Sequence, residues 1–480
     1  MAFRDRLRGC QSRRGAPVTI DFVAADVRGI LHPQTDPIVH QSRGPFIIEK
    51  GDGIWVEDDK GRRYIEAMSS LWCANLGFSN RNLAAAAHRQ FERLPTYHTF
   101  NHRSNSASIT LSEELREISP IPEAKISFTS TGAEANETMI KLVWLYQSAL
   151  GRAHKRKIIC REGAFHGATI FTSAMSGLAS VRGAFVPAGA EVVFTDSIDA
   201  YRNAKPGQSN EDYFEQAIVN LEHLIQREGS DTIGAMIVEP VCGAGGVLVP
   251  TRRYYERLVD VLRRNDILLL SDEVITGFGR TGQWFGCQTF GFVPDMMSVA
   301  KGLSSGYLPI GAALISDGIY QVVAKEAQRL GIFGHGFTYA GHPVTAAVAC
   351  EALRTYKRID VVKMVQALKG QFEARLQQLV EHPLVGNMRC CGLVGALELV
   401  ADKDSRTRFD PVGCAGRLVL ERAIERGLIV RHLGDVIAIC PPLIIRPAEL
   451  DELFERLSGA LDDATDQLLV GGTNGGFDAR

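Results

Sequence analysis

Three parts of the chain carry residues that could do chemistry, and each follows a short apolar run. The run "ILLLSDE" contains Asp272 near its end, and "MMSVAK" ends on Lys301. The run "KISFT" leads into "STGAEAN", whose small residues include Thr131. A carboxylate buried behind a strand needs a cationic or hydrogen-bonding partner, because an isolated buried charge is costly. A lysine in the same position can have a lowered pKa and attack a carbonyl group.

Each feature has an ordinary explanation when it stands alone. Thr131 could simply cap a helix, and Lys301 could be a solvated lysine at a strand end. Taken together, they match the needs of pyridoxal 5'-phosphate (PLP). This cofactor requires donors for its phosphate, a carboxylate that keeps its ring nitrogen protonated, and a lysine that forms a Schiff base. The carboxylate matters because a pyridinium ring withdraws electrons from the substrate carbanion. We therefore expect PLP as the cofactor.

A glycine pattern near Asp272 suggests a different cofactor. Gly277-x-Gly279-x-x-Gly282, within "DEVITGFGRTG", has the letters of a dinucleotide-binding loop. Such a loop must follow its strand at once and open a helix. Here Gly277 comes five residues after Asp272, and the "QWFGCQ" that follows is not a helical pattern. A nicotinamide site is therefore disfavoured, and the glycines are expected to bend the chain near the ligand.

A second pattern suggests a different class of enzyme. Residues 302–306, "GLSSG", fit the G-x-S-x-G motif of a serine-hydrolase nucleophile elbow. That elbow needs a helix after it, but "YLPIG" with Pro309 and Gly311 follows, and proline disfavours a helix there. No HGGG-type segment for an oxyanion hole precedes the motif. A serine hydrolase remains the alternative from another class.

The composition limits the partners. The chain has 480 residues, 45% hydrophobic and 22% charged, with a net charge of -2, so neither nucleic acid nor an anionic membrane is expected to bind. No apolar stretch approaches the ~20 residues that span a bilayer. The basic start "MAFRDRLRGCQSRRGAP" has no apolar run after it and is not a secretory signal, although a transit peptide stays open as a minor option.

The cysteines indicate the cellular compartment, and the histidines indicate whether a metal site is expected. Ten cysteines lie scattered without a C-x-x-C, which favours reduced thiols in a cytoplasmic protein. Twelve histidines show no H-E-x-x-H or similar spacing. The sequence therefore predicts no metal site.

The chain has the pattern of an α/β protein. Short apolar runs bounded by turn residues alternate with amphipathic patterns at residues 134–150, 212–228 and 252–265. This alternation indicates a mainly parallel sheet covered by helices, although a short apolar run can also be a piece of buried helix. The expected strands are residues 125–129, 157–160, 191–195, 234–240, 267–273, 296–301 and 311–316.

The pattern changes toward the ends of the chain. Residues 53–70 predict a hairpin with a turn at residues 58–61. From about residue 346, longer helices and strands around residues 393–400 suggest a second, smaller α+β domain. The expected domains are an N-terminal segment, 1–75, that contributes to the small domain, a PLP-binding large domain, 76–345, and a C-terminal small domain, 346–480.

The order of the motifs resembles that of the class III aminotransferases, which are fold-type I PLP enzymes, and within them the pyruvate-dependent omega-aminotransferases. The resemblance covers about residues 30–460. It implies a fold-type I transferase with a mainly parallel seven-stranded sheet in its large domain. Its marks are "LWCANLGFSN", "LPTYHTFNHRSN", "STGAEANET", "FHGAT", "VEPVCGAGGV", "DEVITGFGRTG", "AKGLSSGYLPIGA", "GHGFTYAGHP" and "RHLGDVIAICPPLII".

The resemblance gives a role to each matching position around the cofactor. Lys301 matches the Schiff-base lysine, Asp272 the partner of the pyridine nitrogen, and Val274 a residue packed on one face of the ring. The remaining cofactor positions are Thr131, Gly132 and Ala133 in the phosphate-binding turn, Phe165, His166, Glu239, and Thr338, which reaches the phosphate in the neighbouring subunit. The last role implies a homodimer with shared active sites, or a tetramer that contains it.

On the substrate side, the resemblance implies three residues. Trp72 and Phe165 match pocket aromatics, and Arg431 matches a mobile arginine that receives the carboxylate of the keto acid. A guanidinium suits this role because it binds a carboxylate through two parallel hydrogen bonds. Arg431 by itself would be read as a surface ion pair.

Three positions depart from patterns found in the family. The aromatic before His-Gly is usually tyrosine and here is Phe165, so a hydroxyl near the Schiff base is missing. The phosphate turn is usually Ser-Gly-Ser, and Ala133 removes one hydroxyl. Ornithine- and GABA-type members have glutamine where this chain has Ile275, which favours the pyruvate-type branch.

The expected activity is transfer of an amino group from an omega-amino acid or amine to an α-keto acid, with pyruvate as the acceptor and alanine as the product. A PLP-dependent decarboxylase or aminomutase on the same scaffold stays open. Which bond breaks depends on which Cα substituent stands perpendicular to the cofactor ring, and the sequence does not fix that.

Overall fold

The computed structural model describes residues 20–186 and 189–471. The basic start of the chain, discussed above as a targeting segment, lies outside these residues. The central feature is a seven-stranded sheet with the order β4-β10-β9-β8-β7-β5-β6. Its strands are β4 (Lys125–Thr129), β5 (Lys157–Arg161), β6 (Val192–Thr195), β7 (Ile233–Val238), β8 (Leu268–Asp272), β9 (Met296–Val299) and β10 (Gly311–Ile315).

All seven expected strands are present, each within two residues of its predicted bounds. The sheet is mainly parallel, since the pairs from β6 through β5, β7 and β8 to β9 are all parallel. β10 runs antiparallel to both of its neighbours, β4 and β9. The predicted α/β architecture with a mainly parallel seven-stranded sheet is therefore confirmed.

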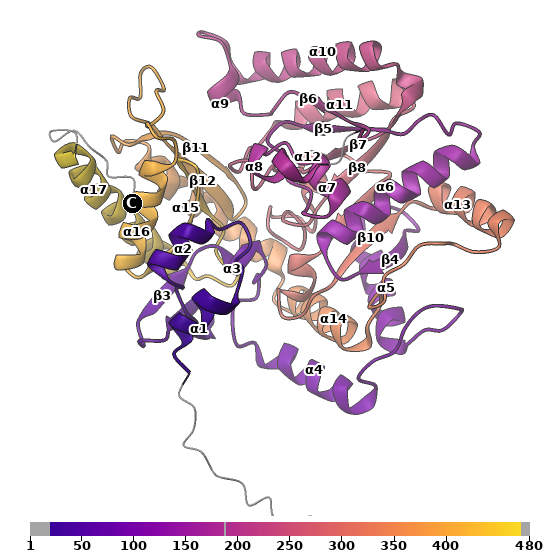
Figure 1. The fold of residues 1–480 in the computed structure, drawn as a ribbon, viewed down its shortest axis with the longest axis horizontal. Coiled ribbons are helices and arrows are strands. Elements are labelled where there is room, and N and C mark those ends of the chain that lie inside the picture. The colour runs from indigo at the N-terminus through magenta and orange to yellow at the C-terminus, as the bar shows by residue number, and fades with distance from the viewer. Residues whose placement is uncertain (1–19, 187–188, 472–480) are drawn as a thin grey trace, which may run out of the picture.

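Helices cover both faces of this sheet (Figure 1). Helices α6 (Gly132–Ala149) and α13 (Asp317–Leu330) pack on one face, and α10 (Asn210–Glu228) and α11 (Arg252–Arg264) on the other. Along β7, Ala235 and Ile237 join the cluster that contains α6, whereas Met236 and Val238 join the cluster that contains α11. Both faces of a strand are thus buried, which explains why the strands read as continuous apolar runs.

The two ends of the chain meet in a second sheet. Strands β1 (Ile48–Asp52), β2 (Trp55–Asp58) and β3 (Arg63–Glu66) form an antiparallel meander, and β13 (Leu428–Ile429) adds in parallel to β3. The predicted hairpin is confirmed, with Gly61 at φ +78° in its turn. Figure 1 shows this N-terminal region beside the C-terminal helices.

The C-terminal elements form a third sheet with its own helices. Its order is β11-β12-β15-β14, with β11 (Val385–Cys391), β12 (Val394–Leu399), β14 (Arg431–Leu433) and β15 (Val436–Ile439). Helices α15 (Val361–Leu379), α16 (Cys414–Glu425) and α17 (Pro447–Gly471) lie with it. The division of the chain at residues 75 and 345 stays a prediction.

The remaining helices connect these sheets or cover their edges. They are α1 (Phe22–Gly29), α2 (Pro37–Arg43), α3 (Ser69–Trp72), α4 (Arg81–Arg93), α5 (Ser106–Ile118), α7 (Ile170–Ala174), α8 (Ala179–Arg182), α9 (Ala200–Asn203), α12 (Gly286–Phe290) and α14 (Pro343–Arg358), with 3-10 turns at Gly183–Phe185, Ser230–Thr232 and Lys301–Ser304. Within the described part of the chain, every helix is too short or too polar to cross a membrane.

A buried carboxylate holds the irregular turn α3 after β3. Ser69, Ser70 and Trp72 have positive φ values of 49°, 59° and 63°, a region that costs free energy for residues other than glycine. The Glu66 carboxylate accepts hydrogen bonds from the N–H of Met68 (3.1 Å) and from the N–H of Ser70. Glu66 is 5% exposed. Burial raises the pKa of Glu66 to about 7, and the two backbone hydrogen bonds partly oppose this shift.

Glu66 should make the stability of the fold depend on pH. Its pKa is higher in the folded than in the unfolded protein, so ionisation costs folding free energy as the pH rises from about 4.5 through about 7. The full cost above that range is about 3 kcal/mol. Glu66→Gln should therefore reduce the loss of unfolding free energy between about pH 5 and about pH 8 by about 2–3 kcal/mol. Denaturant titrations of both proteins at each pH would measure this difference, and parallel pH curves would contradict it.

Candidate active site

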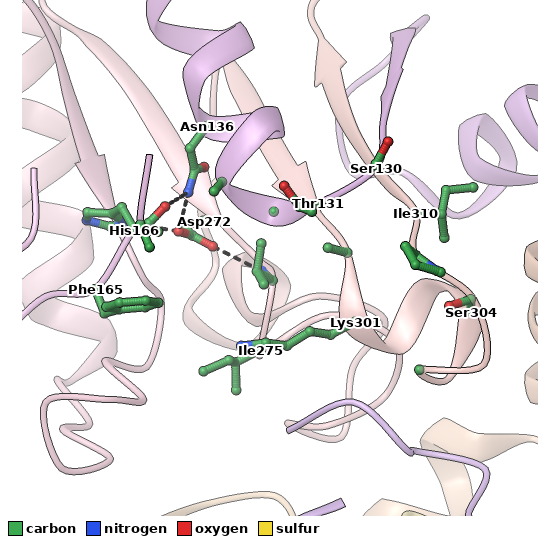
Figure 2. Close-up of a pocket in the computed structure, with 18 of the residues that line it drawn as sticks. Ser130, Thr131, Asn136, Phe165, His166, Asp272, Ile275, Lys301, Ser304 and Ile310 are labelled. Atoms are coloured by element: carbon green, nitrogen blue, oxygen red, sulfur yellow. Dashed lines mark hydrogen bonds and ion pairs between the residues drawn. The ribbon is translucent and has the colours of Figure 1, made fainter. Parts of the chain in front are cut away.

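A cavity of about 430 Å³ opens at the carboxyl ends of the parallel strands (Figure 2). The segments after β4, β5, β7, β8 and β9 all reach this edge, where ligands bind in open α/β sheets. Nine of the twelve predicted site residues line the cavity: Thr131, Gly132, Ala133, Phe165, His166, Glu239, Asp272, Val274 and Lys301.

The Asp272 carboxylate has three hydrogen-bonding partners in the wall of the cavity. Its Oδ2 accepts hydrogen bonds from Asn136 Nδ2 (2.8 Å) and lies 2.9 Å from His166 Nδ1. Its Oδ1 accepts the N–H of Val274 at 3.1 Å. The side chain is only 5% exposed, so these partners replace the water that an ionised carboxylate would lose on burial. The arrangement holds a negative charge at a fixed point of the cavity (Figure 2).

The phosphate end of the cavity is the start of α6. Thr131 is the N-cap of this 18-residue helix, and its hydroxyl accepts the N–H of Glu134 at 3.1 Å. The ordinary role considered for Thr131, a helix cap, is therefore real. The same residue lines the cavity with Gly132 and Ala133, so the free N–H groups of the first turn face the place where an anion would sit.

Lys301 enters the cavity from the turn after β9. Its backbone has φ +40°, and the 3-10 turn Lys301–Ser304 begins at this residue. Burial lowers the pKa of Lys301, and the negative charge of Asp272 opposes that effect. A lowered pKa raises the fraction of neutral amine, which is the form that can attack a carbonyl or accept a proton.

Glu239 supports the wall that carries Phe165. Its Oε1 accepts the N–H of Phe165 and its Oε2 the N–H of Gly243, both at 3.0 Å. Burial raises the pKa of Glu239, and the neighbouring His166 opposes the shift. Glu239 therefore fixes the backbone of the cavity wall in addition to lining the cavity.

The cavity fits PLP. An acceptor for the ring nitrogen, a lysine amine and a helix start lie around one space, as the cofactor requires. Gly132 is needed at the phosphate end, because a Cβ there would lie 2.7 Å from Val274 Cγ2. In addition, His166 Nε2 and Asn136 Oδ1 are buried without a protein partner within the described residues. Such groups are typical of polar sites that hold a ligand or water.

Three predicted site residues lie away from this cavity. Trp72 is buried in the turn α3, Thr338 is exposed after α13, and Arg431 is half-buried on β14. None of them is among the residues that line the cavity of this single chain. Their roles stay predictions.

Asn136 is a site residue that the sequence analysis missed. Its Nδ2 donates to Asp272 Oδ2 (2.8 Å) and to the backbone oxygen of His166 (2.7 Å). It therefore connects the helix α6, the carboxylate and the loop after β5. Its position was readable, since it lies one helical turn after Gly132 on the same face, within the quoted "STGAEAN". Other lining residues outside the predicted site include Ser130, Ile275, Ser304, Leu308 and Ile310.

The two competing motifs do not have the required surroundings. Glycine pattern residues 277–282 lie in turns, with φ +97° at Gly279 and +87° at Gly282, and the first helix after them is the five-residue α12. The sequence analysis predicted no helix after Gly282, so the short helix α12 is a small difference between that prediction and the structure. In the second motif, the Ser304 hydroxyl donates to Leu308 O (2.6 Å), and β10 rather than a helix follows.

Known proteins share this chain's sequence over most of its length. The family model for class-III aminotransferases matches residues 38–461. A tomato protein, gamma aminobutyrate transaminase 3, chloroplastic, is 39% identical and aligns over 93% of this chain and 87% of its own length. The vanillin aminotransferase of Capsicum chinense is 40% identical, over 87% of this chain and 92% of its own.

Solved structures agree with the sequence relatives. The omega transaminase from Pseudomonas jessenii in complex with PMP is 45% identical, with a TM-score of 0.92, over 94% of this chain and all of that one. The PMP-bound aminotransferase from Vibrio fluvialis is 36% identical, with a TM-score of 0.90 over the same shares. Membership of one enzyme family thus explains why Asp272, Lys301 and the start of α6 meet around one cavity. This chain belongs to the class-III aminotransferase family, and it is a fold-type I enzyme that uses PLP to transfer amino groups.

Proposed function

We propose that this aminotransferase moves an amino group from an omega-amino acid or amine to pyruvate and releases alanine. The single observation that carries the proposal is Arg431, a half-buried arginine on β14. Burial lowers its pKa, and within residues 20–186 and 189–471 no carboxylate lies within ion-pair distance of it. A guanidinium in this state is suited to receive the carboxylate of a keto acid.

Each residue of the cavity has a separate role in the proposed reaction. Bound PLP supplies a carbonyl for the amine and an electron sink for the electrons released at the substrate Cα. Asp272 would keep the ring nitrogen protonated, and the start of α6 would hold the phosphate. Lys301 Nζ would bind the cofactor and then carry the proton to and from the substrate Cα, for which its lowered pKa is suited.

The walls of the cavity support an amine donor of low polarity. Phe165, Val274, Ile275, Leu308 and Ile310 are apolar and line it. The family resemblance places Ile275 where the GABA-type and ornithine-type members have glutamine. Among the relatives, one is named for GABA, which carries a carboxylate, and another for vanillin, which does not. A donor range that includes amines with and without a carboxylate is consistent with both.

The alternative reactions would use the same residues. A decarboxylase or an aminomutase also needs a lysine, a pyridinium partner and a phosphate site. Arg431 favours transamination, because a movable carboxylate receptor is needed when two different substrates take turns in one site. A panel of amines with pyruvate, followed by detection of both alanine and carbon dioxide, would separate the three activities. The aminotransferase forms alanine without carbon dioxide, a decarboxylase releases carbon dioxide, and an aminomutase forms neither.

A homodimer with shared active sites, or a tetramer that contains it, is part of the proposal. Thr338 supports it, because this residue is exposed and lies away from the cavity of its own chain. The neighbouring Ile332, Phe333 and Tyr339 are large exposed apolar residues, at 65%, 39% and 67%. A second chain that covers this surface would bring Thr338 to a phosphate site.

A cytoplasmic location is also proposed. The nine cysteines of the described chain are all free thiols, which suits a reducing compartment. Two plant relatives carry the words chloroplastic and mitochondrial in their names. Cell fractionation of the native protein would decide between the cytosol and an organelle.

Removal of the lysine should stop catalysis. In Lys301→Ala, both the amine that binds the cofactor and the group that moves the Cα proton are missing, so turnover should fall below detection. Borohydride treatment should also no longer fix the cofactor to the chain, which mass spectrometry would show. Lys325→Ala, at an exposed position on α13, is the matched control. Transamination above a small fraction of the wild-type rate in Lys301→Ala would refute the assignment.

The charge of Asp272 should matter more than its shape. Asp272→Asn keeps the size of the side chain but cannot hold a proton on the ring nitrogen, so both half-reactions should slow by about a hundred- to a thousandfold or more. Asp295→Asn is the control, because this carboxylate binds Leu269 N (2.8 Å) at the opposite edge of the sheet. Stopped-flow rates for the two variants would test this, and equal effects of the two substitutions would mean a structural role.

Arg431 should act on one half-reaction only. Its charge-assisted pair with a carboxylate is worth about 1.5–3 kcal/mol. In Arg431→Ala, kcat/KM for pyruvate should therefore fall about ten- to a hundredfold or more, whereas an uncharged monoamine should change less than about threefold. Arg417→Ala, exposed on the neighbouring α16, serves as the control. Stopped-flow measurement of each half-reaction decides it, and equal losses in both would show that Arg431 is not the carboxylate receptor.

A further inference from the structure

The first two helices, α1 and α2, pair without an apolar core. Neither helix has a buried residue. The large apolar side chains on these helices and next to them are instead exposed, namely Ile20, Phe22, Val23, Ile30, Leu31, Ile38 and Val39. The contact between the two helices therefore depends on polar side chains.

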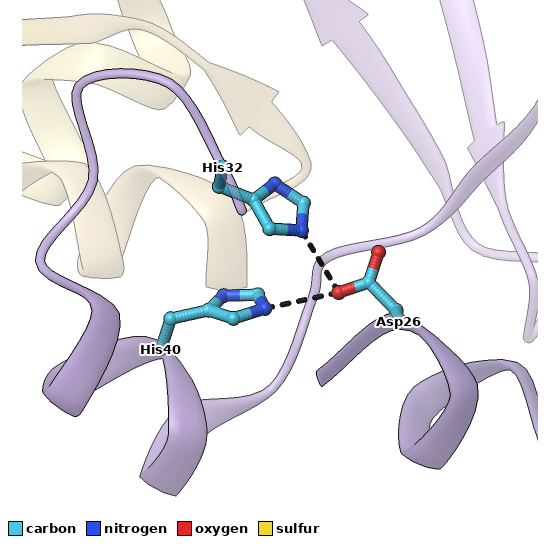
Figure 3. A group of neighbouring side chains, drawn as sticks. All are labelled: Asp26, His32 and His40. Atoms are coloured by element: carbon cyan, nitrogen blue, oxygen red, sulfur yellow. Dashed lines mark hydrogen bonds and ion pairs between the residues drawn. The ribbon is translucent and has the colours of Figure 1, made fainter. Parts of the chain in front are cut away.

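Three partly buried polar side chains link α1 to α2. Asp26 on α1, His32 on the connecting turn and His40 on α2 point toward one another (Figure 3). Their exposed fractions are 17%, 30% and 11%. His32 Nε2 and His40 Nε2 each lie 2.9 Å from the same carboxylate oxygen, Asp26 Oδ1. One oxygen thus joins two imidazoles from two different segments.

The three atoms have the spacing of metal ligands. All of them lie within 4.8 Å of one another. Zinc binds histidine nitrogen and carboxylate oxygen at about 2.0–2.1 Å, so two ligand atoms of a tetrahedral zinc ion are separated by about 3.3 Å. Asp26 Oδ1 lies 2.9 Å from each histidine Nε2, so these atoms would have to move apart by only a few tenths of an ångström to admit the ion. Two histidines and one carboxylate on one side of an ion leave further positions for water, as in known three-ligand sites.

The surroundings provide room for those waters. A cavity of about 320 Å³ adjoins the cluster and is lined by His32, His40, Thr35 and Gln41. Arg28 also lines this cavity.

We propose that Asp26, His32 and His40 bind one divalent transition-metal ion of the kind that imidazole favours, such as Zn²⁺, Co²⁺ or Ni²⁺. The ion replaces the protons that would otherwise lie between the two imidazoles and the carboxylate. It joins α1 to α2, and it stabilises this part of the fold because it binds the folded arrangement and not the unfolded segment. The sequence predicted no metal site, because the D-x5-H-x7-H spacing matches no standard motif.

Binding is tested with the full-length, untagged holoenzyme after treatment with a chelator. Titration with Co²⁺ should give a visible absorption band that saturates at one ion per chain and that Zn²⁺ abolishes. Asp26→Asn, His32→Gln and His40→Gln should each weaken binding more than about tenfold, since even a residue that only supports a metal ligand has that effect. His88→Gln should bind as the wild type does, because His88 is exposed and pairs with Glu92 (3.4 Å) outside the cluster.

A second measurement needs no substitution at the site. Zn²⁺ should protect His32 and His40 of the wild-type protein against acylation by diethylpyrocarbonate, as seen by peptide mass spectrometry, and should leave His88 reactive. The transamination rate of every variant reports that the enzyme is folded, because the cluster lies outside the catalytic cavity. The proposal is overturned if wild-type protein binds no Co²⁺ at about millimolar concentration, or if the three variants bind it as well as His88→Gln. Equal acylation of His32 and His40 with and without Zn²⁺ would also overturn it and would leave a plain hydrogen-bonded link.

Discussion

The active site depends on the burial of one carboxylate at the end of a hydrophobic strand. Asp272 ends β8, the middle strand of the large sheet, and lies among groups that are almost fully buried. Such a charge is tolerated only if other donors replace its water. The donors come from three segments: Asn136 on α6, His166 in the loop after β5, and the backbone of Val274. The hydrogen bonds to the Asp272 carboxylate therefore fix the start of α6 and one wall of the cavity.

The next residue, Glu273, is also a buried carboxylate that needs hydrogen-bond donors. Glu273 is fully buried, and its carboxylate receives the N–H groups of Gly286 and Cys287 (2.7 Å each) and the hydroxyl of Ser271 (3.2 Å). Burial raises the pKa of Glu273 against these donors. The chain therefore turns after β8 around a carboxylate whose two oxygens are both hydrogen-bonded, directly after Asp272.

Arg280 extends the polar framework to the other end of the chain. It is fully buried and donates to the backbone oxygens of Leu393 (2.9 Å) and Pro441 (2.6 Å) and to Asn75 Oδ1 (2.9 Å). Burial lowers its pKa. The glycines on either side of it, Gly279 and Gly282, have positive φ values, which lets the chain turn so that the guanidinium reaches these partners. The pattern that resembles a dinucleotide loop is thus explained by the placement of an arginine.

The sequence by itself determined the strands and the residues at their ends. Parallel strands are buried on both faces, so the seven strands stood out as apolar runs, and Asp272, Lys301 and Thr131 stood out as polar residues beside them. Tertiary structure alone decided the order of the strands, the antiparallel β10 and the pairing of β13 with β3, because local patterns carry no information on which strands become neighbours. It also decided the contacts between distant residues, such as Asn136 with Asp272, and the meeting of Asp26, His32 and His40. These contacts follow from how helices and loops pack in space, which the spacing of residues along the chain does not record.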